Sequence, residues 1–190
     1  KRIKIIEDCA HAFGSSISNI KTGSIGIAGC FSFFSTKTIT TGEGGMLTTN
    51  DPQMFNLAKS LRERGRDWSK DVEIYNNAWR TCRVPEFSAL LGLNQISQIK
   101  KINSHRNKVC KIYNKILDKS DYLKPLPFFK NIKLSIWKHI TIIKNKKISR
   151  DILKKNLFEK YGIVINWAYT PALHLQPVYK KIFKKEKIRL

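Results

Sequence analysis

Residues 29–45 read GCFSFFSTKTITTGEGG, an aromatic run that leads directly to Lys37, followed by threonines and a cluster of glycines. A lysine in such a setting can act as a nucleophile, because partial desolvation or nearby cations favour its neutral amine. A lysine at a strand end can also extend its ammonium group into water over an apolar stem. The spacing of this stretch alone leaves both interpretations open.

The composition indicates a folded and strongly basic protein. The chain has 190 residues, enough for one domain or for one domain and part of another, and its 42% hydrophobic content excludes wholesale disorder. The formal net charge is +22, from 36 Lys and Arg against 14 Asp and Glu. This excess is compatible with a nucleic-acid partner, an anionic membrane surface or an anionic substrate. A general enrichment in solvated lysines is the favoured alternative, because the basic residues do not alternate with aromatic stacking residues.

The cysteines and the apolar runs favour a cytoplasmic location. No run approaches the ~20 apolar residues of a membrane-spanning helix. The opening KRIKII is interrupted by Glu7 and Asp8 before the apolar core of a signal peptide develops. The cysteines form no CxxC pair and no metal-ligand spacing, so we expect reduced, mostly buried thiols: Cys9, Cys30, Cys82 and Cys110.

The first third of the chain has the pattern of an α/β fold. The apolar run at residues 3–7 predicts a buried strand that ends in two acids, and residues 25–34 predict a second buried strand. Residues 38–49 alternate in polarity around a glycine-rich turn and predict a hairpin.

Two helical regions are predicted next. Asp51 before Pro52 predicts the start of a helix that runs to about Arg64, where Gly65 stops it. Residues 85–119 carry apolar side chains at helical spacing, which predicts one long helix or two in succession that bridge two structural regions.

The last third predicts a small α+β domain. The pattern indicates a strand at residues 136–143, a helix at 149–161 and a strand at 163–167, followed by the sequence HLQP. A basic tail follows at residues 180–190.

Asp8 and Ser32, taken together with Lys37, suggest one kind of site. Asp8 ends a predicted buried strand, where an unpaired carboxylate is costly unless it meets a cation. Ser32 precedes Lys37 in the same region and can donate a hydrogen bond to an anion. An acid, a lysine and a phosphate-binding hydroxyl are what pyridoxal phosphate (PLP) requires, because the acid keeps the pyridine nitrogen protonated and the lysine binds the aldehyde.

Several segments together resemble one enzyme family: IIEDCAHAFGSS, KTGSIGIAGCFSFFSTKTITTGEGGMLTTND, LRERGR, RVPEFSALLGLNQI and PALHLQPVY. They resemble the PLP-dependent nucleotide-sugar aminotransferases of the DegT/DnrJ/EryC1/StrS family, and they cover most of the chain. The resemblance implies the type I aminotransferase fold, an α/β class, and a homodimer. It also implies transfer of an amino group from glutamate or glutamine to a nucleotide-linked keto sugar.

The resemblance assigns roles to four residues of the first two segments. Lys37 is implied to bind the cofactor covalently and to carry a proton between the substrate Cα and C4′ of the cofactor. Asp8 is implied to pair with the pyridinium nitrogen, His11 to contact the phenolic oxygen and Ser32 to bind the phosphate. A dehydrating branch of the family has His in place of the lysine, so Lys37 implies transamination.

Two further residues match less specific positions. Arg83 lies where a neighbouring subunit approaches the cofactor phosphate in some relatives, although Thr81-Cys82 replaces the Asn-Tyr that commonly precedes it. His174, in HLQP, matches a histidine on the substrate side of the pocket, and a structural loop histidine is the alternative. His105 and His139 match no family position, so we interpret them as ordinary helix and strand residues.

The resemblance also predicts the domain organisation. Residues 1–84 correspond to the C-terminal part of the large PLP-binding domain, residues 85–119 to a connecting helical segment and residues 120–190 to the small C-terminal domain. The chain is expected to be the C-terminal half of such an enzyme, without a membrane or nucleic-acid partner. The alternative is an inactive relic or a stand-alone basic module that binds nucleic acid.

Overall fold

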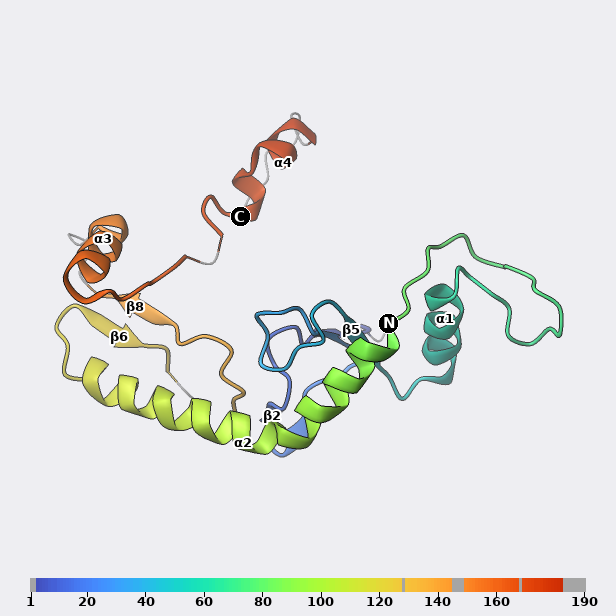
Figure 1. Ribbon diagram of the computed structural model, residues 1–190, viewed down its shortest axis with the longest axis horizontal. Coiled ribbons are helices and arrows are strands. Elements are labelled where there is room, and N and C mark those ends of the chain that lie inside the picture. Colours follow the sequence, from blue (N-terminus) through green and yellow to red (C-terminus); the bar gives the residue numbers. More distant parts are fainter. Residues whose placement is uncertain (1–2, 128, 145–148, 168, 183–190) are drawn as a thin grey trace. The chain divides into compact units, whose positions relative to one another are not determined.

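The computed structural model describes residues 3–127, 129–144, 149–167 and 169–182. The chain divides into two compact units, residues 1–144 and 145–190 (Figure 1). Each unit is described by itself.

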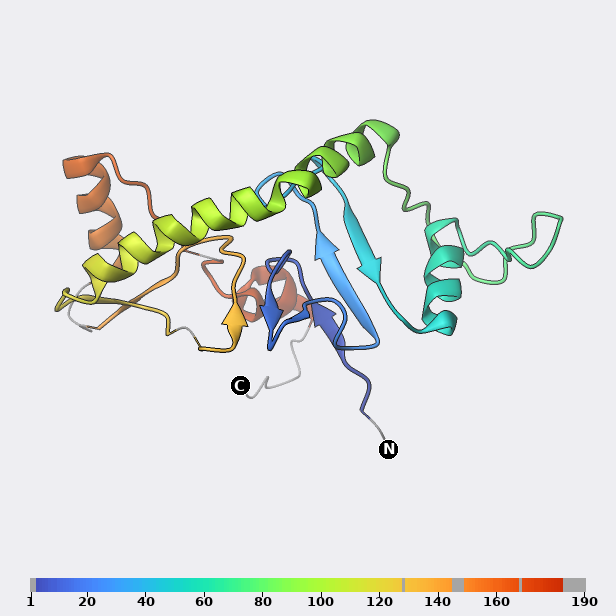
Figure 2. The same cartoon turned by 90° about the horizontal axis from the view of Figure 1, so that it is seen from below.

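A three-stranded sheet in the first unit carries both predicted buried strands. Its order is β1 (Ile6–Asp8), β4 (Ala28–Ser32) and β5 (Gly45–Thr48). β1 and β4 are parallel, while β5 runs antiparallel to β4 (Figure 2). Strands are present at both predicted places, at residues 6–8 and 28–32. The predicted burial is wrong for β1, in which Ile6 and Asp8 are exposed, and holds for the first two residues of β4. Because β1 and β4 are parallel, their carboxyl ends lie at the same edge of the sheet.

The predicted hairpin at residues 38–49 is wrong in its first arm. β5 pairs with β4, and residues 33–44 form the loop between these strands. The loop uses its polar groups locally: the Thr41 amide and the Thr40 hydroxyl both donate to the carbonyl of Phe33, at 2.9 and 3.0 Å. The Thr40 amide donates to Gln95 Oε1 at 2.9 Å. These backbone groups are therefore not available for a strand ladder.

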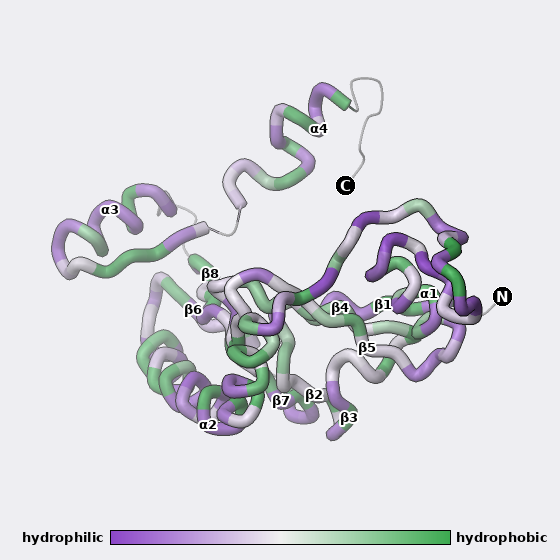
Figure 3. Tube along the Cα trace, turned by 45° about the vertical axis from the view of Figure 1, so that its right-hand side comes forward, coloured by the Kyte–Doolittle hydropathy of each residue, from purple (hydrophilic) through white to green (hydrophobic). Residues whose placement is uncertain are grey.

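A second small sheet joins distant parts of the first unit. Its order is β3 (Ile20–Lys21), β2 (Ser16–Ile17) and β7 (Ile132–Lys133), all antiparallel (Figure 3). Next to it, the Ser135 amide donates to Ser15 Oγ at 2.8 Å. The sheet thereby brings the residues after β7 close to the turns that follow β1.

The helix α1 (Pro52–Arg62) confirms the predicted start at Pro52. Asp51 Oδ1 accepts hydrogen bonds from the amides of Gln53 and Met54, which satisfies two of the free donors of the first turn. The helix ends two residues earlier than predicted, and the Gly65 amide closes this end by donating to the carbonyl of Ser60 at 2.8 Å. Gly65 has a φ of +90°, which explains the glycine.

Residues predicted as one or two helices form the single helix α2 (Glu86–Leu117), seen along its length in Figure 2. Its buried Gly92 lies against the loop after β4, since a Cβ at this position would lie 2.9 Å from Thr41 Cγ2. A glycine is therefore required for the helix to approach this loop so closely.

The strand predicted at residues 136–143 is present only in its second half. β8 (Thr141–Ile143) pairs with β6 (Leu123–Pro125) in an antiparallel ladder. The preceding residues bind α2 instead, because the Arg106 guanidinium donates to the carbonyls of Ile136 and Trp137. The backbone of residues 136 and 137 is thus held by α2, whereas the ladder with β6 begins at Thr141.

The second unit contains α3 (Arg150–Tyr161), the 3₁₀ helix η1 (Leu173–Leu175) and α4 (Pro177–Ile182). α3 confirms the predicted helix at 149–161. The strand predicted at 163–167 is wrong: no strand lies within the described residues of this unit. The segment turns back along α3, and Trp167 Nε1 donates to Asp151 Oδ1 at 3.3 Å. Most of the basic tail at 180–190 lies outside the described residues.

Burial and exposure are unevenly distributed over the described residues. The buried apolar side chains are Cys9, Ala28, Phe33, Ile39 and Cys110. Cys30 and Cys82 are exposed, so the expectation of mostly buried thiols holds for two of the four cysteines. On α2, Phe87 and Leu93 expose 88% and 66% of their surface, and extended apolar exposure of this kind is typical of an interface. None of the described helices is long and apolar enough to cross a bilayer.

Candidate active site

Four predicted site residues lie in or next to the two turns that follow β1 and β4: Asp8, His11, Ser32 and Lys37. Asp8 is the last residue of β1, and Ser32 is the last residue of β4. The parallel register places Asp8 opposite Cys30, and the Cys9 amide extends the pairing by donating to the Cys30 carbonyl at 2.9 Å. The carboxyl edge of parallel strands is the usual place for a ligand in α/β folds.

The turn after β1 leaves an acid with unused acceptor capacity. Asp8 Oδ1 accepts a hydrogen bond from the Ala10 amide at 3.0 Å, and the Ala12 amide donates to the Cys9 carbonyl at 3.0 Å. Among the residues that the structure describes, Asp8 Oδ2 accepts no hydrogen bond. The Asp8 side chain is exposed, so this oxygen is accessible to a ligand.

The turn after β4 positions Lys37. The Lys37 amide donates to the carbonyl of Phe34 at 2.9 Å, and Ser32 Oγ accepts a long 3.4 Å hydrogen bond from the Phe34 amide. Within the described ranges, the Ser32 hydroxyl has no acceptor and no carboxylate lies within 4.0 Å of Lys37 Nζ. Both groups thus remain available to bind an anion and an aldehyde, respectively.

His11 stacks on the ring of Trp137, which belongs to the distant segment before β8. The imidazole lies on the indole of Trp137 with ring centroids 3.7 Å apart and an interplanar angle of 13°. Trp137 Nε1 donates to the carbonyl of Thr36 at 2.7 Å, and Lys37 Nζ lies 4.9 Å from the indole centroid. Trp137 therefore contacts both turns, which makes it part of the site.

Desolvation and nearby charges lower the pKa of His11 and so favour its neutral imidazole. Desolvation lowers the pKa of His11 below 6.5, since the indole removes water from one face although the side chain remains partly exposed. The positive charges of Lys37 and Lys138 lower the pKa further, while Asp8 acts in the opposite direction. A neutral imidazole has one donor and one acceptor nitrogen.

Glu7 fixes the loop that leads into β4. Its carboxylate accepts hydrogen bonds from the amides of Gly23 at 2.8 Å, Ile25 at 2.7 Å and Gly26 at 2.8 Å. Burial alone would raise the pKa of Glu7, but the three amide donors outweigh it and lower the pKa below 4.5. Glu7 thus holds the loop before β4 in place, a structural role that its position in the sequence does not reveal.

The other predicted residues lie elsewhere. Arg83 Nε pairs with Glu63 Oε2 at 3.4 Å, and 62% of the Arg83 side chain is exposed. No hydrogen bond, ion pair or ring contact joins Arg83 to the cluster around Lys37 within the described residues. His174 is half-buried in η1, in the second unit.

The two histidines without a family match differ from each other. His105 is exposed on α2, which agrees with an ordinary helix residue. His139 precedes β8 and binds Asn114 Oδ1 through Nε2 at 2.8 Å. Burial lowers the pKa of His139.

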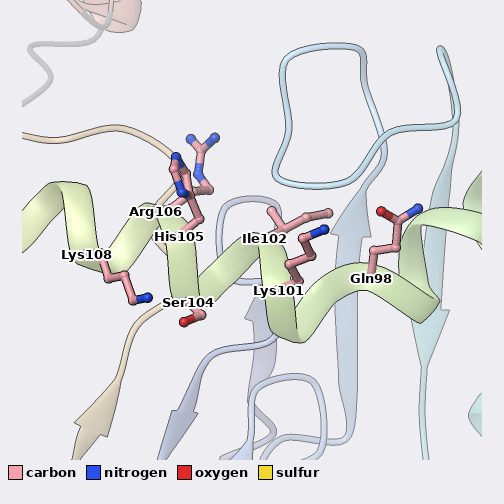
Figure 4. A pocket seen from close by; sticks show the side chains of 7 residues that line it. All are labelled: Gln98, Lys101, Ile102, Ser104, His105, Arg106 and Lys108. Atoms are coloured by element: carbon pink, nitrogen blue, oxygen red, sulfur yellow. The ribbon is translucent and has the colours of Figure 1, made fainter.

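Two hollows of the first unit lie away from Lys37. One, of about 550 Å³, follows α2, and Figure 4 shows its lining side chains on successive turns: Gln98, Lys101, Ile102, Ser104, His105, Arg106 and Lys108. The other, of about 1000 Å³, lies between β5, α1 and residues 82–84. Neither includes Asp8, His11, Ser32 or Lys37.

Trp137 could not have been found from the sequence. It stands in LSIWKHI, which has no motif spacing to Lys37, and the pattern favoured a strand there. The pairing of β7 with β2, the hydrogen bond to Ser15 and the contacts with α2 bring this segment to the site.

The chain is similar to known proteins in sequence and in fold. GDP-perosamine synthase of Escherichia coli O157:H7 is 30% identical over 99% of this chain and 50% of its own length. The structure of Helicobacter pylori PseC, an aminotransferase involved in pseudoaminic acid biosynthesis, matches with a TM-score of 0.86 and 26% identity over 98% of this chain and 50% of its own. The PLP form of Streptococcus pneumoniae Spr1654 matches with a TM-score of 0.83 and 27% identity, over 96% of this chain and 47% of its own.

The chain spans about half the length of the curated relatives it matches. The match to the family itself extends over residues 1–190. With the site residues at the carboxyl edge of β1 and β4, this full-length match identifies the chain as a member of the DegT/DnrJ/EryC1/StrS aminotransferase family.

Proposed function

We propose that this chain acts in a PLP-dependent transfer of an amino group from glutamate or glutamine to a nucleotide-linked keto sugar. The observation that carries the proposal is the meeting of Asp8, His11, Ser32 and Lys37 on two turns at one sheet edge. Relatives named as GDP-perosamine synthase and as an aminotransferase support the reaction class.

The unused bonding capacity of these side chains fits PLP. The cofactor offers a pyridine nitrogen, a phenolic oxygen, a phosphate and an aldehyde, and when bound it supplies an electron sink for a carbanion at the substrate Cα. Among the described residues, Asp8 Oδ2 and Lys37 Nζ have no hydrogen-bond partner, and the Ser32 hydroxyl accepts from the Phe34 amide but donates to no acceptor. The His11 imidazole is held there by stacking alone. An acid, an anion donor and a free amine are thus present together.

Each side chain then has a defined task. Asp8 holds a proton at the pyridine nitrogen, and Ser32 donates a hydrogen bond to a phosphate oxygen. The neutral His11 imidazole hydrogen-bonds the phenolic oxygen, with its plane set by Trp137. Lys37 would hold the cofactor at its aldehyde carbon with loss of water, and its amine, once displaced by the amine of the substrate, would carry a proton at the substrate Cα.

Two further predicted residues have proposed tasks outside the cluster around Lys37. Arg83, exposed beside Glu63, reaches the phosphate bound in the neighbouring subunit of a homodimer. His174 contributes to the substrate side of the pocket. Residues 1–84, 85–119 and 120–190 act as large-domain part, connecting segment and small domain in a cytoplasmic enzyme.

Borohydride trapping tests the assignment of Lys37. The full chain is incubated with PLP, reduced, digested and mapped by mass spectrometry, and the pyridoxyl label is expected on Lys37. Lys138→Ala is the matched control, because Lys138 Nζ lies 4.1 Å from the same indole centroid. The label should persist in this variant and disappear in Lys37→Ala. A label spread over surface lysines, or unchanged in Lys37→Ala, contradicts the proposal.

A further inference from the structure

We propose that Trp137 is a positioning residue of this site, which holds the His11 ring and the backbone ahead of Lys37 in place across the ends of β1 and β4. Its task in the reaction rests on the proposed function, whereas its task in ordering the two turns does not. Trp137 lies between the motifs RVPEFSALLGLNQI and PALHLQPVY, outside both of them.

The first contact fixes the lysine turn. Trp137 Nε1 donates to the carbonyl of Thr36 at 2.7 Å, directly before Lys37 in the chain. The indole also lies 4.9 Å from Lys37 Nζ, a distance at which a ring attracts an ammonium group. Both contacts restrict where the Lys37 amine can lie.

The second contact fixes the imidazole. Within the described residues, neither nitrogen of His11 has a hydrogen-bond partner, so rotation of the ring is limited by its stack on Trp137. The near-parallel arrangement at 3.7 Å sets the imidazole plane and leaves both nitrogens free for a ligand. The stack uses the face of the His11 ring, so the nitrogens at its edge can still form hydrogen bonds.

Trp137 can perform this task because its own backbone is fixed. The Arg106 guanidinium binds the carbonyls of Ile136 and Trp137, and Asn107 Nδ2 donates to the carbonyl of Leu134 at 3.1 Å. Side chains of α2 thus hold the backbone that carries the indole. A side chain on a fixed backbone loses less conformational entropy when it orders a neighbour.

Histidine NMR of the full chain tests the ordering without any cofactor. The ring protons of His11 are expected upfield in the wild type because they lie over an indole face. In Trp137→Ala they should move to the positions of exposed histidines such as His105. The pKa of His11 should rise towards 6.5, although Lys37, Lys138 and Asp8 still act on it. Trp68→Ala is the matched control, since Trp68 packs against Lys59 and Arg66 instead.

Trp137→Phe separates the two contacts and guards against misfolding of the alanine variant. Phenylalanine keeps a ring for His11 but cannot donate to Thr36. His11 should stay upfield, while the rate of PLP trapping at Lys37 should fall about fivefold to tenfold, as for one lost hydrogen bond. His11 shifts that are unchanged in Trp137→Ala, or equally changed in Trp68→Ala, overturn the proposal.

The outcomes distinguish this inference from the proposed function. If His11 responds to Trp137→Ala but wild-type PLP does not label Lys37, the ordering stands and the aminotransferase assignment fails. If Lys37 is labelled but His11 does not respond, the aminotransferase assignment stands and the positioning role is wrong.

Discussion

The backbone amide of Ser135 donates a 2.8 Å hydrogen bond to the hydroxyl of Ser15, and both residues are buried. Ser135 Oγ in turn donates to Asn103 Oδ1 of α2 at 2.9 Å. This pair of contacts ties the turns after β1 to the segment that carries Trp137. The geometry of the candidate site therefore depends on residues that are far from it in the sequence.

Ser15→Ala should destabilise the first unit by about 1–3 kcal/mol, because it leaves the buried Ser135 amide without an acceptor. Urea unfolding followed by circular dichroism measures the change. Ser104→Ala, on the exposed face of α2, should change stability by less than about 0.5 kcal/mol. Equal effects of the two substitutions would contradict the importance of the Ser15 contact.

Glu7→Gln should destabilise the protein by about 1–3 kcal/mol at pH 7, because a neutral amide cannot accept from three backbone donors as a carboxylate does. The exposed Glu159, paired with Lys155 at 3.9 Å, provides the control Glu159→Gln, with an expected loss of less than about 1 kcal/mol.

The same residue predicts a pH dependence. The pKa of Glu7 is lower in the folded state than its ordinary 4.5, so its contribution is fully present above that value. The contribution is lost as the pH falls through the lower, folded-state pKa. In this acidic range, the stability of Glu7→Gln should fall less steeply with decreasing pH than that of the wild type. Parallel pH profiles would show that the amide contacts of Glu7 are not formed in solution.

Asp8→Asn should separate cofactor binding from chemistry. Under the proposed function, the substitution removes the charge that would keep the pyridine nitrogen protonated. It retains an oxygen for the Ala10 amide, so the turn should persist. Labelling of Lys37 by PLP and borohydride should continue. The half-reaction with glutamate, followed by absorbance, should slow by orders of magnitude, since each ~1.4 kcal/mol of lost transition-state stabilisation is tenfold in rate.

Asp71→Asn, in the exposed loop after α1, is the control and should leave the half-reaction unchanged. If Asp8→Asn reacts at nearly the wild-type rate, Asp8 serves only to cap the turn after β1.

The basic surface should bind nucleic acid only weakly. Because the net charge of +22 is attributed to solvated lysines, affinity for random duplex DNA should collapse as salt rises and should show no sequence preference. Fluorescence anisotropy between low and physiological salt measures this. Lys101→Glu, in the basic hollow of α2, should reduce the residual binding. Tight, sequence-selective binding at physiological salt would favour the nucleic-acid-binding module instead.

Local sequence predicted the elements whose signals are local. The capping of α1 by Asp51 and the position of α3 follow from side chains within one or two turns, whereas the sequence left open whether residues 85–119 form one helix or two. The resemblance to the family implied that Asp8 and Lys37 belong to one site, but the parallel pairing of β1 and β4, which places Asp8 and Ser32 at one edge of the sheet, is known only from the structure.

The tertiary structure decided which segments pair and what completes the site. Residues 38–41 have an alternating pattern, yet their backbone binds Phe33 and Gln95, because the loop is held between the sheet and α2. Trp137 lies beside Lys37 because Arg106 binds the backbone of its segment and Ser15 accepts a hydrogen bond from Ser135. No periodicity in the sequence encodes such contacts. Hydrophobic patterns specify which face of an element is buried, whereas a contact across 100 residues of sequence depends on how all the elements pack.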